Sequence, residues 1–197
     1  MTQHVTVTVV DLDSEELVRG QHAIAGAAQP AAIVMLGADP SAGTRTVLVE
    51  FPDGWSREAT GHQPAGEEMV VLSGALTISG LTCGVGQSLV VEPHATRSAT
   101  STTDGTRAVV WFSGPGGGWA DGEAEQAGAA EVLAADETLD RGPRAGLVGT
   151  LRGLASAAGL VFDTDVDVLW PQARRWADVP AGTPVPDVAG PAIVHTR

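Results

Sequence analysis

The stretch that most constrains this chain runs from residue 54 to residue 74, GWSREATGHQPAGEEMVVLSG. Two runs typical of β-strands, WSREAT and MVVLSG, lie on either side of a polar turn. His62 and Glu67 flank this turn, and an imidazole and a carboxylate can each hold a metal ion or move a proton. The stretch therefore predicts two neighbouring strands with reactive side chains at the turn between them.

Short apolar runs separated by turns continue over most of the first 115 residues. Asp39-Pro40 and Gly43 supply turn chemistry between two of these runs. Seven or eight short strands with no long helix predict an all-β sandwich or barrel. Besides the two runs above, the predicted strands are residues 5–10, 31–37, 45–51, 75–80, 88–92 and 107–112.

The spacing within residues 54–74 resembles the first motif of the cupin superfamily. That motif has a glycine, five residues, H-x-H, three or four residues, a glutamate, six residues and a second glycine. Gly54, His62, Glu67 and Gly74 fit this spacing, and Thr60 stands where the first histidine would be. The resemblance implies a cupin double-stranded β-helix, that is, a jelly-roll barrel.

The segment GQSLVVEPHATR, from Gly86 to Arg97, resembles the second cupin motif more loosely, with Arg97 at the position of its last histidine. The surrounding sequence is most similar to the ChrR-type branch of cupins, and the resemblance covers about residues 33–113. It implies a small-molecule site inside the barrel.

Cupin metal sites use three imidazoles and one carboxylate, at positions that correspond here to Thr60, His62, Glu67 and Arg97. Only His62 and Glu67 retain ligand chemistry, because a guanidinium stays protonated and cannot ligate a metal. We therefore expect no tight Fe, Zn or Mn site and no other cofactor. If a metal binds, His62 and Glu67 would hold it.

We predict that His62, Glu67 and Arg97 form one catalytic group in the barrel. Arg97 would neutralise Glu67 and leave His62 as a neutral imidazole for acid–base chemistry. Arg97 could equally bind a substrate carboxylate or enolate. In the alternative interpretation the three side chains only satisfy one another, since buried charges must be paired whatever their function.

Strand alternation places Glu58, Thr60 and His62 on one face, and Glu67 with Met69 on one face of the next strand. The cupin resemblance implies that both faces line the barrel interior. Glu58, Thr60 and Met69 are therefore candidates for substrate contacts.

The same alternation turns Trp55 and Arg57 outward, unless the strand is bulged, and Glu68 toward solvent. In residues 107–112 it does not select which face points inward, and we take Trp111 as the fourth candidate for a substrate contact. His94 lies in a turn and could reach the site, because loops often carry function.

Composition and charge exclude several classes of protein. The 197 residues carry a formal charge of −13, which disfavours nucleic acids and anionic membrane surfaces as partners. The single cysteine, Cys83, excludes an internal disulfide and a multi-cysteine zinc site, and we expect it to be a packed or turn residue rather than a nucleophile. The start of the sequence has neither a signal-peptide pattern nor a membrane-length apolar run, so we expect a cytoplasmic protein.

We divide the chain into an N-terminal arm (1–30), a cupin barrel (31–114) and a C-terminal extension (115–197) that packs on the barrel or on a dimer partner. The glycine-rich segment GPGGGWADG begins the extension, and the acidic stretch after it predicts a connector or a short helix. The apolar run at residues 5–10 offers an edge strand, so we expect a homodimer. His4, His22 and His195 are predicted to lie at the surface.

The leading functional hypothesis is a small-molecule enzyme that uses acid–base chemistry without a metal. It would be an isomerase, cyclase or lyase of the kind found in bacterial secondary metabolism. One alternative is a metal-dependent cupin dioxygenase, and another is a non-catalytic barrel that binds a small ligand or serves as a scaffold.

Overall fold

A computed structural model describes residues 6–197, and these residues form β-strands and turns without any helix. They divide into two compact units. The barrel unit comprises residues 17–134 and 145–147, and the second unit comprises residues 6–16, 135–144 and 148–197. The strands of the barrel unit are β2 (Gly20–His22), β3 (Ala31–Asp39), β4 (Thr44–Glu50), β5 (Ser56–Arg57), β6 (Gly61–His62), β7 (Gly66–Ser73), β8 (Ala75–Ile78), β9 (Leu81–Gly84), β10 (Gln87–Val91), β11 (Thr100–Thr102), β12 (Arg107–Ser113), β13 (Ala120–Asp121) and β14 (Ala130–Ala134).

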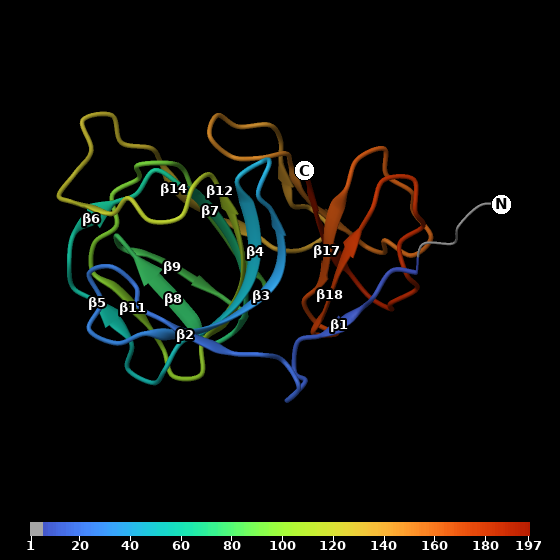
Figure 1. Cartoon of the computed structure of the whole chain (residues 1–197), viewed down its shortest axis with the longest axis horizontal. Helices are drawn as coiled ribbons and strands as arrows, with labels where there is room; N and C mark the ends of the chain where they lie inside the picture. The colour runs from blue at the N-terminus through green and yellow to red at the C-terminus, as the bar shows by residue number, and fades with distance from the viewer. Residues whose placement is uncertain (1–5) are drawn as a thin grey trace. The chain divides into compact units, whose positions relative to one another are not determined.

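The barrel unit is built from two facing antiparallel sheets and a small two-stranded one (Figure 1). The large sheet has the order β14-β10-β7-β12-β4-β3-β2, the smaller sheet has the order β5-β11-β8-β9, and β13 pairs with β6. Side chains from the two larger sheets form one apolar core, in which Val71 and Val110 of the large sheet meet Leu76 and Ile78 of the smaller one. This is the predicted all-β jelly-roll barrel, and that prediction is confirmed.

The C-terminal part of residues 54–74 folds as the sequence predicts. In β7, Met69 and Val71 point into the core, since side chains alternate along a strand. Gly74 ends the motif with a positive φ of 66°, and a Cβ there would lie 2.3 Å from the Thr106 hydroxyl oxygen. The last glycine of the motif is therefore required both by its backbone conformation and by a close approach.

The barrel unit extends beyond the predicted boundaries at residues 31 and 114. β2 adds an edge strand on one side, and β14 pairs with β10 on the other. We predicted a connector or a short helix after residue 122, and this prediction is wrong for residues 130–134, which form the strand β14. Ala130 and Val132 pack against the core, and β14 covers the backbone of β10 that would otherwise form a bare sheet edge.

The second unit has one antiparallel sheet of order β1-β18-β17-β19-β16-β15 and its own apolar core. The strand predicted at residues 5–10 is confirmed only at its end, while Val7 and Val9 pack against this core and Val5 lies outside the described residues. His195 is buried, contrary to the predicted surface position, because β19 lies inside the sheet; His22 is exposed, and His4 lies outside the described residues. The strands of this unit are β1 (Val10–Asp11), β15 (Asp140–Arg141), β16 (Leu151–Leu154), β17 (Val166–Trp170), β18 (Arg175–Val179) and β19 (Ala192–Thr196).

Residues 6–197 include no helical segment that could span a membrane. Cys83 belongs to the core of the barrel unit, where burial raises the pKa of its thiol to about 12. The prediction that Cys83 is a packed residue is therefore confirmed. The homodimer stays a prediction.

Candidate functional site

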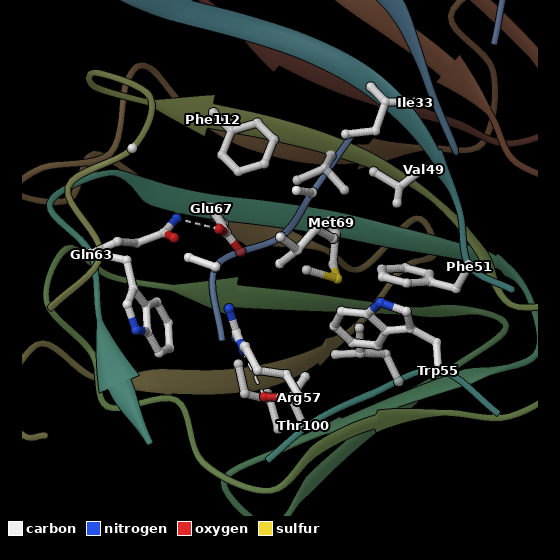
Figure 2. Close-up of a pocket in the computed structure, with 18 of the residues that line it drawn as sticks. Ile33, Val49, Phe51, Trp55, Arg57, Gln63, Glu67, Met69, Thr100 and Phe112 are labelled. Carbon is white, nitrogen blue, oxygen red and sulfur yellow. Dashed lines mark hydrogen bonds between the residues drawn. The ribbon is translucent and has the colours of Figure 1, made fainter. Parts of the chain in front are cut away.

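A cavity of about 290 Å³ lies inside the barrel unit, between the large and the smaller sheet (Figure 2). Its wall is mostly apolar, but one end carries charged and polar groups. This polar end consists of Arg45, Arg57, Gln63, Glu67 and Thr100. The remaining lining residues are Ala23, Ile24, Ala25, Ile33, Val49, Phe51, Trp55, Met69, Leu76, Ile78, Val110, Phe112, Gly117 and Trp119.

Glu67 is the acidic group of this cavity, and one of its two carboxylate oxygens is held firmly. The Nε2 of Gln63 donates a hydrogen bond of 2.5 Å to Glu67 Oε1, and Nη2 of Arg97 lies 3.5 Å from the same oxygen. The predicted pairing of Arg97 with Glu67 is therefore confirmed. Among residues 6–197, no hydrogen-bond donor contacts the other oxygen, Oε2. The carboxylate thus has one anchored oxygen and one available oxygen.

Arg97 reaches Glu67 from behind the cavity wall. Its backbone pairs with Gly61 through two hydrogen bonds of 2.8 and 3.1 Å, and its side chain has no exposed surface. Nη1 donates to the carbonyl of Ala95 at 3.4 Å, whereas Nε and Nη2 have no hydrogen-bond partner among the described residues, so Nη2 meets Glu67 as an ion pair only. Arg97 is therefore a buried counter-charge for Glu67, and it does not itself line the cavity.

Gln63, and not His62, faces Glu67. The predicted interior position of His62 is wrong, because Gly61 in β6 and Gln63 just after it face the cavity side, and His62 between them faces away from it. The cupin motif allows three residues as well as four before its glutamate, and the three-residue spacing fits Gln63 here. The five-residue spacing after Gly54 fits His62 instead, so the two parts of the motif disagree on which residue faces the glutamate.

His62 instead contacts His94, at a site that does not line the cavity. Their Nδ1 atoms are 3.2 Å apart, and the ring centroids are 5.3 Å apart. His94 has a positive φ of 61°, and its backbone N–H donates to the carbonyl of Gln63. The two imidazoles therefore form a pair beside the cavity wall, and the possibility that His94 reaches the cavity is not realised.

The faces predicted for the first strand are reversed. Trp55 and Arg57 are buried and line the cavity, whereas Ser56, Glu58 and Thr60 are exposed. The reason is that His62 itself faces away from the cavity, so alternation turns the face of Glu58, Thr60 and His62 outward and the face of Trp55 and Arg57 inward. Glu58 and Thr60 are thus removed from the set of cavity residues.

Of the other two substrate-contact candidates, Met69 lines the cavity and Trp111 does not. In β12 the cavity-facing pair is Val110 and Phe112, which leaves Trp111 buried on the opposite face. Glu68 is also fully buried on that face, contrary to the predicted solvent position.

Arg57 is the most deeply buried charged residue of the cavity lining, with 6% of its surface exposed. Its Nη2 donates a long hydrogen bond of 3.4 Å to the Thr100 hydroxyl, and its Cζ lies 4.4 Å from the centroid of the Trp119 ring. Burial lowers the pKa of Arg57 to about 10, opposed by the negative charge of Glu67 and assisted by the positive charge of Arg97. Arg57 therefore stays protonated at neutral pH.

Arg45 adds a third guanidinium near Glu67. Its Cζ lies 4.1 Å from the centroid of the Phe112 ring, and its Nη1 is 3.5 Å from the carbonyl oxygen of Gly114. Burial lowers the pKa of Arg45, and the charge of Glu67 opposes this shift.

The side chains around Glu67 do not fit a divalent metal ion. A guanidinium cannot lose its proton to ligate a metal, and Arg45, Arg57 and Arg97 would repel a cation. Gln63 is the neighbour with a neutral oxygen, and it uses its amide N–H₂ group on Glu67. Across residues 6–197, no group of three or more His, Cys, Asp or Glu side chains could hold a metal ion. This donor set suits an anion better than a cation.

No protein-family model matches the chain, and no curated protein matches it. Solved structures do match. A proposed dioxygenase from Nostoc punctiforme has a TM-score of 0.70 at 12% identity, over 97% of this chain and 82% of that one. A proposed glyoxylate-induced protein from Pseudomonas aeruginosa has a TM-score of 0.55 at 9% identity, over 99% of this chain and 85% of that one.

At these identities the likeness establishes the fold alone. Together with the two facing sheets, it shows that this protein has the cupin fold. The cavity between those sheets is where a protein of this class would hold a small molecule. The neighbours show only the fold, so the ChrR-type resemblance stays a prediction.

Proposed function

We propose that this protein is a small-molecule enzyme that moves a proton between carbon or oxygen atoms of its substrate, with Glu67 as the proton acceptor and donor. The observation that carries the proposal is the asymmetry of the Glu67 carboxylate. Oε1 is anchored by Gln63 and Arg97, and Oε2 is left available in a cavity that is otherwise mostly apolar. A general base needs one free oxygen in a fixed position near the substrate.

Each neighbour of Glu67 has a separate part in this mechanism. Gln63 fixes the rotation of the carboxylate, since its hydrogen bond to Oε1 selects which oxygen faces the substrate. Arg97 supplies a buried positive charge behind the carboxylate without occupying cavity space. The apolar wall excludes water, which strengthens electrostatic interactions inside the cavity.

The proposed step is the removal of a proton from a carbon next to a carbonyl group. The C–H bond breaks, its electron pair enters the enolate, and the proton moves to Glu67 Oε2. Return of that proton to a different atom completes an isomerisation and regenerates the carboxylate. Neither an oxidant nor a reductant is consumed.

Hydrogen–deuterium exchange at such carbons tests the proposal without knowledge of the natural substrate. Phenylpyruvate and 2-oxobutyrate are incubated with the protein in D₂O, and loss of the proton next to the carbonyl is followed by NMR. Exchange should be catalysed by the wild type and slowed at least about a hundredfold by Glu67→Gln, the usual contribution of a general base. Glu58→Gln, the same change at an exposed glutamate outside the cavity, is the matched control.

Two results would replace the proposal with an alternative. If chelation stops turnover and added Fe, Zn or Mn restores it, the protein is a metal-dependent enzyme such as a dioxygenase. If the probes bind but exchange at the same rate as in buffer, the barrel is a ligand-binding module.

A further inference from the structure

Arg57 lies on the opposite side of the cavity from Glu67 and is not neutralised by it. The two side chains point toward one another from the smaller and the large sheet (Figure 2). Arg57 forms no ion pair with any carboxylate among residues 6–197; its one hydrogen bond is the 3.4 Å contact with Thr100, and its Nε has no partner. Trp119 covers one face of the guanidinium.

Burial of a cation with so few partners destabilises the folded protein unless a ligand supplies hydrogen-bond acceptors and a counter-charge. Transfer of an ionised group out of water is strongly unfavourable without a counter-charge and full hydrogen bonding. Here the cost is visible as the lowered pKa of Arg57, whose largest cause is burial. The arrangement is that of a preformed anion site.

The charge balance of the cavity leads to the same conclusion. Arg45, Arg57 and Arg97 lie near Glu67, which is the acidic residue in the described lining, so this end has an excess of two positive charges. The chain as a whole carries a formal charge of −13. The positive charge is thus concentrated inside the barrel, where apolar walls strengthen its field.

We propose that the cavity takes a small organic monoanion, a carboxylate with an apolar body. Its oxygens accept hydrogen bonds from Arg57, and its body lies against the wall that includes Phe51, Trp55 and Met69. This inference names the substrate class of the proposed proton-transfer site and rests on that function for its catalytic meaning. Binding itself can be tested separately.

Size and charge limit the ligand further. A volume of about 290 Å³ holds on the order of ten non-hydrogen atoms, at roughly 30 Å³ for each water-sized group. A second charged group on the ligand would lie against a wall that is mostly apolar, which makes its transfer from water unfavourable. A compact monoanion is therefore preferred to a dianion such as phosphate.

Isothermal titration calorimetry with benzoate, benzamide and inorganic phosphate tests the proposal. Benzoate and benzamide have nearly the same shape, so the difference between them measures the anion site. We expect the wild type to bind benzoate at least about tenfold more tightly than benzamide or phosphate, the effect of one charge-assisted hydrogen bond. Equal binding of benzoate and benzamide, or tighter binding of phosphate, would overturn the proposal.

Variants assign the effect to Arg57. Arg57→Met should remove the preference for benzoate over benzamide, and Arg57→Lys should keep part of it because the charge is retained. Arg19→Met is the matched control, since Arg19 belongs to the same unit, pairs with Glu50 and does not line the cavity. If Arg57→Met binds benzoate as the wild type does, Arg57 is not the anion site.

Glu67→Gln separates this inference from the proposed function. It should abolish exchange of the carbon-bound proton but keep benzoate binding, because Arg57 is untouched. Retained exchange in Glu67→Gln contradicts the proton-transfer role alone, whereas retained benzoate preference in Arg57→Met contradicts the anion site alone.

Discussion

Each of the two units contains a fully buried arginine, and the two arginines differ in how their guanidinium groups are hydrogen-bonded. In the second unit, Arg141 is 1% exposed and donates to the backbone carbonyls of Gly142, Gly149 and Val148, with distances of 3.1, 2.6 and 3.3 Å. In the barrel unit, Arg97 has one carbonyl contact of 3.4 Å and a carboxylate at 3.5 Å. The guanidinium of Arg141 therefore donates several hydrogen bonds to backbone carbonyls, whereas that of Arg97 donates one long hydrogen bond.

This difference distinguishes a structural cation from a functional one. Fixed carbonyls at short distance stabilise Arg141 in a single state and leave it no capacity for a ligand. Arg97 and Arg57 keep unused donors around a cavity, which is an arrangement that a folding requirement alone does not explain. Four experiments can break or sharpen the comparison.

The largest expected effect is on stability, from Arg141→Met. Loss of the guanidinium leaves three backbone carbonyls without their donor, and an unsatisfied buried group costs about 1–3 kcal/mol. We expect the free energy of unfolding in urea to fall by about 3 kcal/mol or more, with benzoate affinity of the folded protein unchanged within about twofold. If Arg141→Met keeps its stability but no longer binds benzoate, Arg141 has the functional role and is not a structural cation.

The second effect converts the cavity from an anion site into a cation site. Gln63→His together with Arg97→His places two imidazoles near Glu67 and removes one repelling charge, which supplies the three ligands that a zinc site needs. Zn²⁺ should bind this double variant at least about a hundredfold more tightly than it binds Thr60→His with Arg97→His. The control pair follows the motif spacing in the sequence, but Thr60 is exposed. Equal zinc affinity of the two variants, measured by calorimetry, would show that Gln63 is not the residue facing Glu67.

The contrast between Gln63 and Thr60 shows how far the sequence could be used. The fold was predictable because its sequence signals are local. Apolar residues at every second position indicate strands, and glycines with a positive φ, such as Gly74, indicate turns. Glu67 and Met69 were predictable for the same reason, since both belong to the unbroken strand β7. Alternation places both on one face, and the cupin resemblance implies that this face points inward.

The other cavity residues were not predictable in this way. The cupin spacing assigns His62 to the interior, and alternation from an interior His62 gives the wrong face for Arg57. Trp119 comes from the glycine-rich segment after β12, and only the folded chain brings it onto Arg57. One signal was present: Trp55 and Arg57 alternate with Ser56 and Glu58, and an aromatic residue on the same face as an arginine indicates a buried face.

The third effect is a smaller change in ligand affinity, from Gly61→Ala. A Cβ at Gly61 would lie 2.3 Å from the Trp119 ring and 2.5 Å from the carbonyl oxygen of Ala120, so the ring must move off Arg57. We expect benzoate affinity to fall by about threefold to tenfold, the value of a lost cation–π and wall contact of about 1 kcal/mol. Gly84→Ala, where the added Cβ meets only ordinary contacts of 3.8–4.0 Å, is the control. Equal effects of the two substitutions would mean that Trp119 does not support the anion site.

The smallest effect is the dependence of benzoate binding on pH between 6 and 9, which we expect to be less than about twofold. A carboxylic acid with a pKa of about 4 is ionised throughout this range, and Arg57, with a pKa of about 10, is protonated throughout it. Because binding needs the charged guanidinium, affinity should fall only as pH rises through about 10, by roughly tenfold for each further pH unit. The residual affinity of Arg57→Met should show no such fall. If the affinity of the wild type does not fall as pH rises through about 10, Arg57 is not the anion site, and the cavity arginines return to a structural role like that of Arg141.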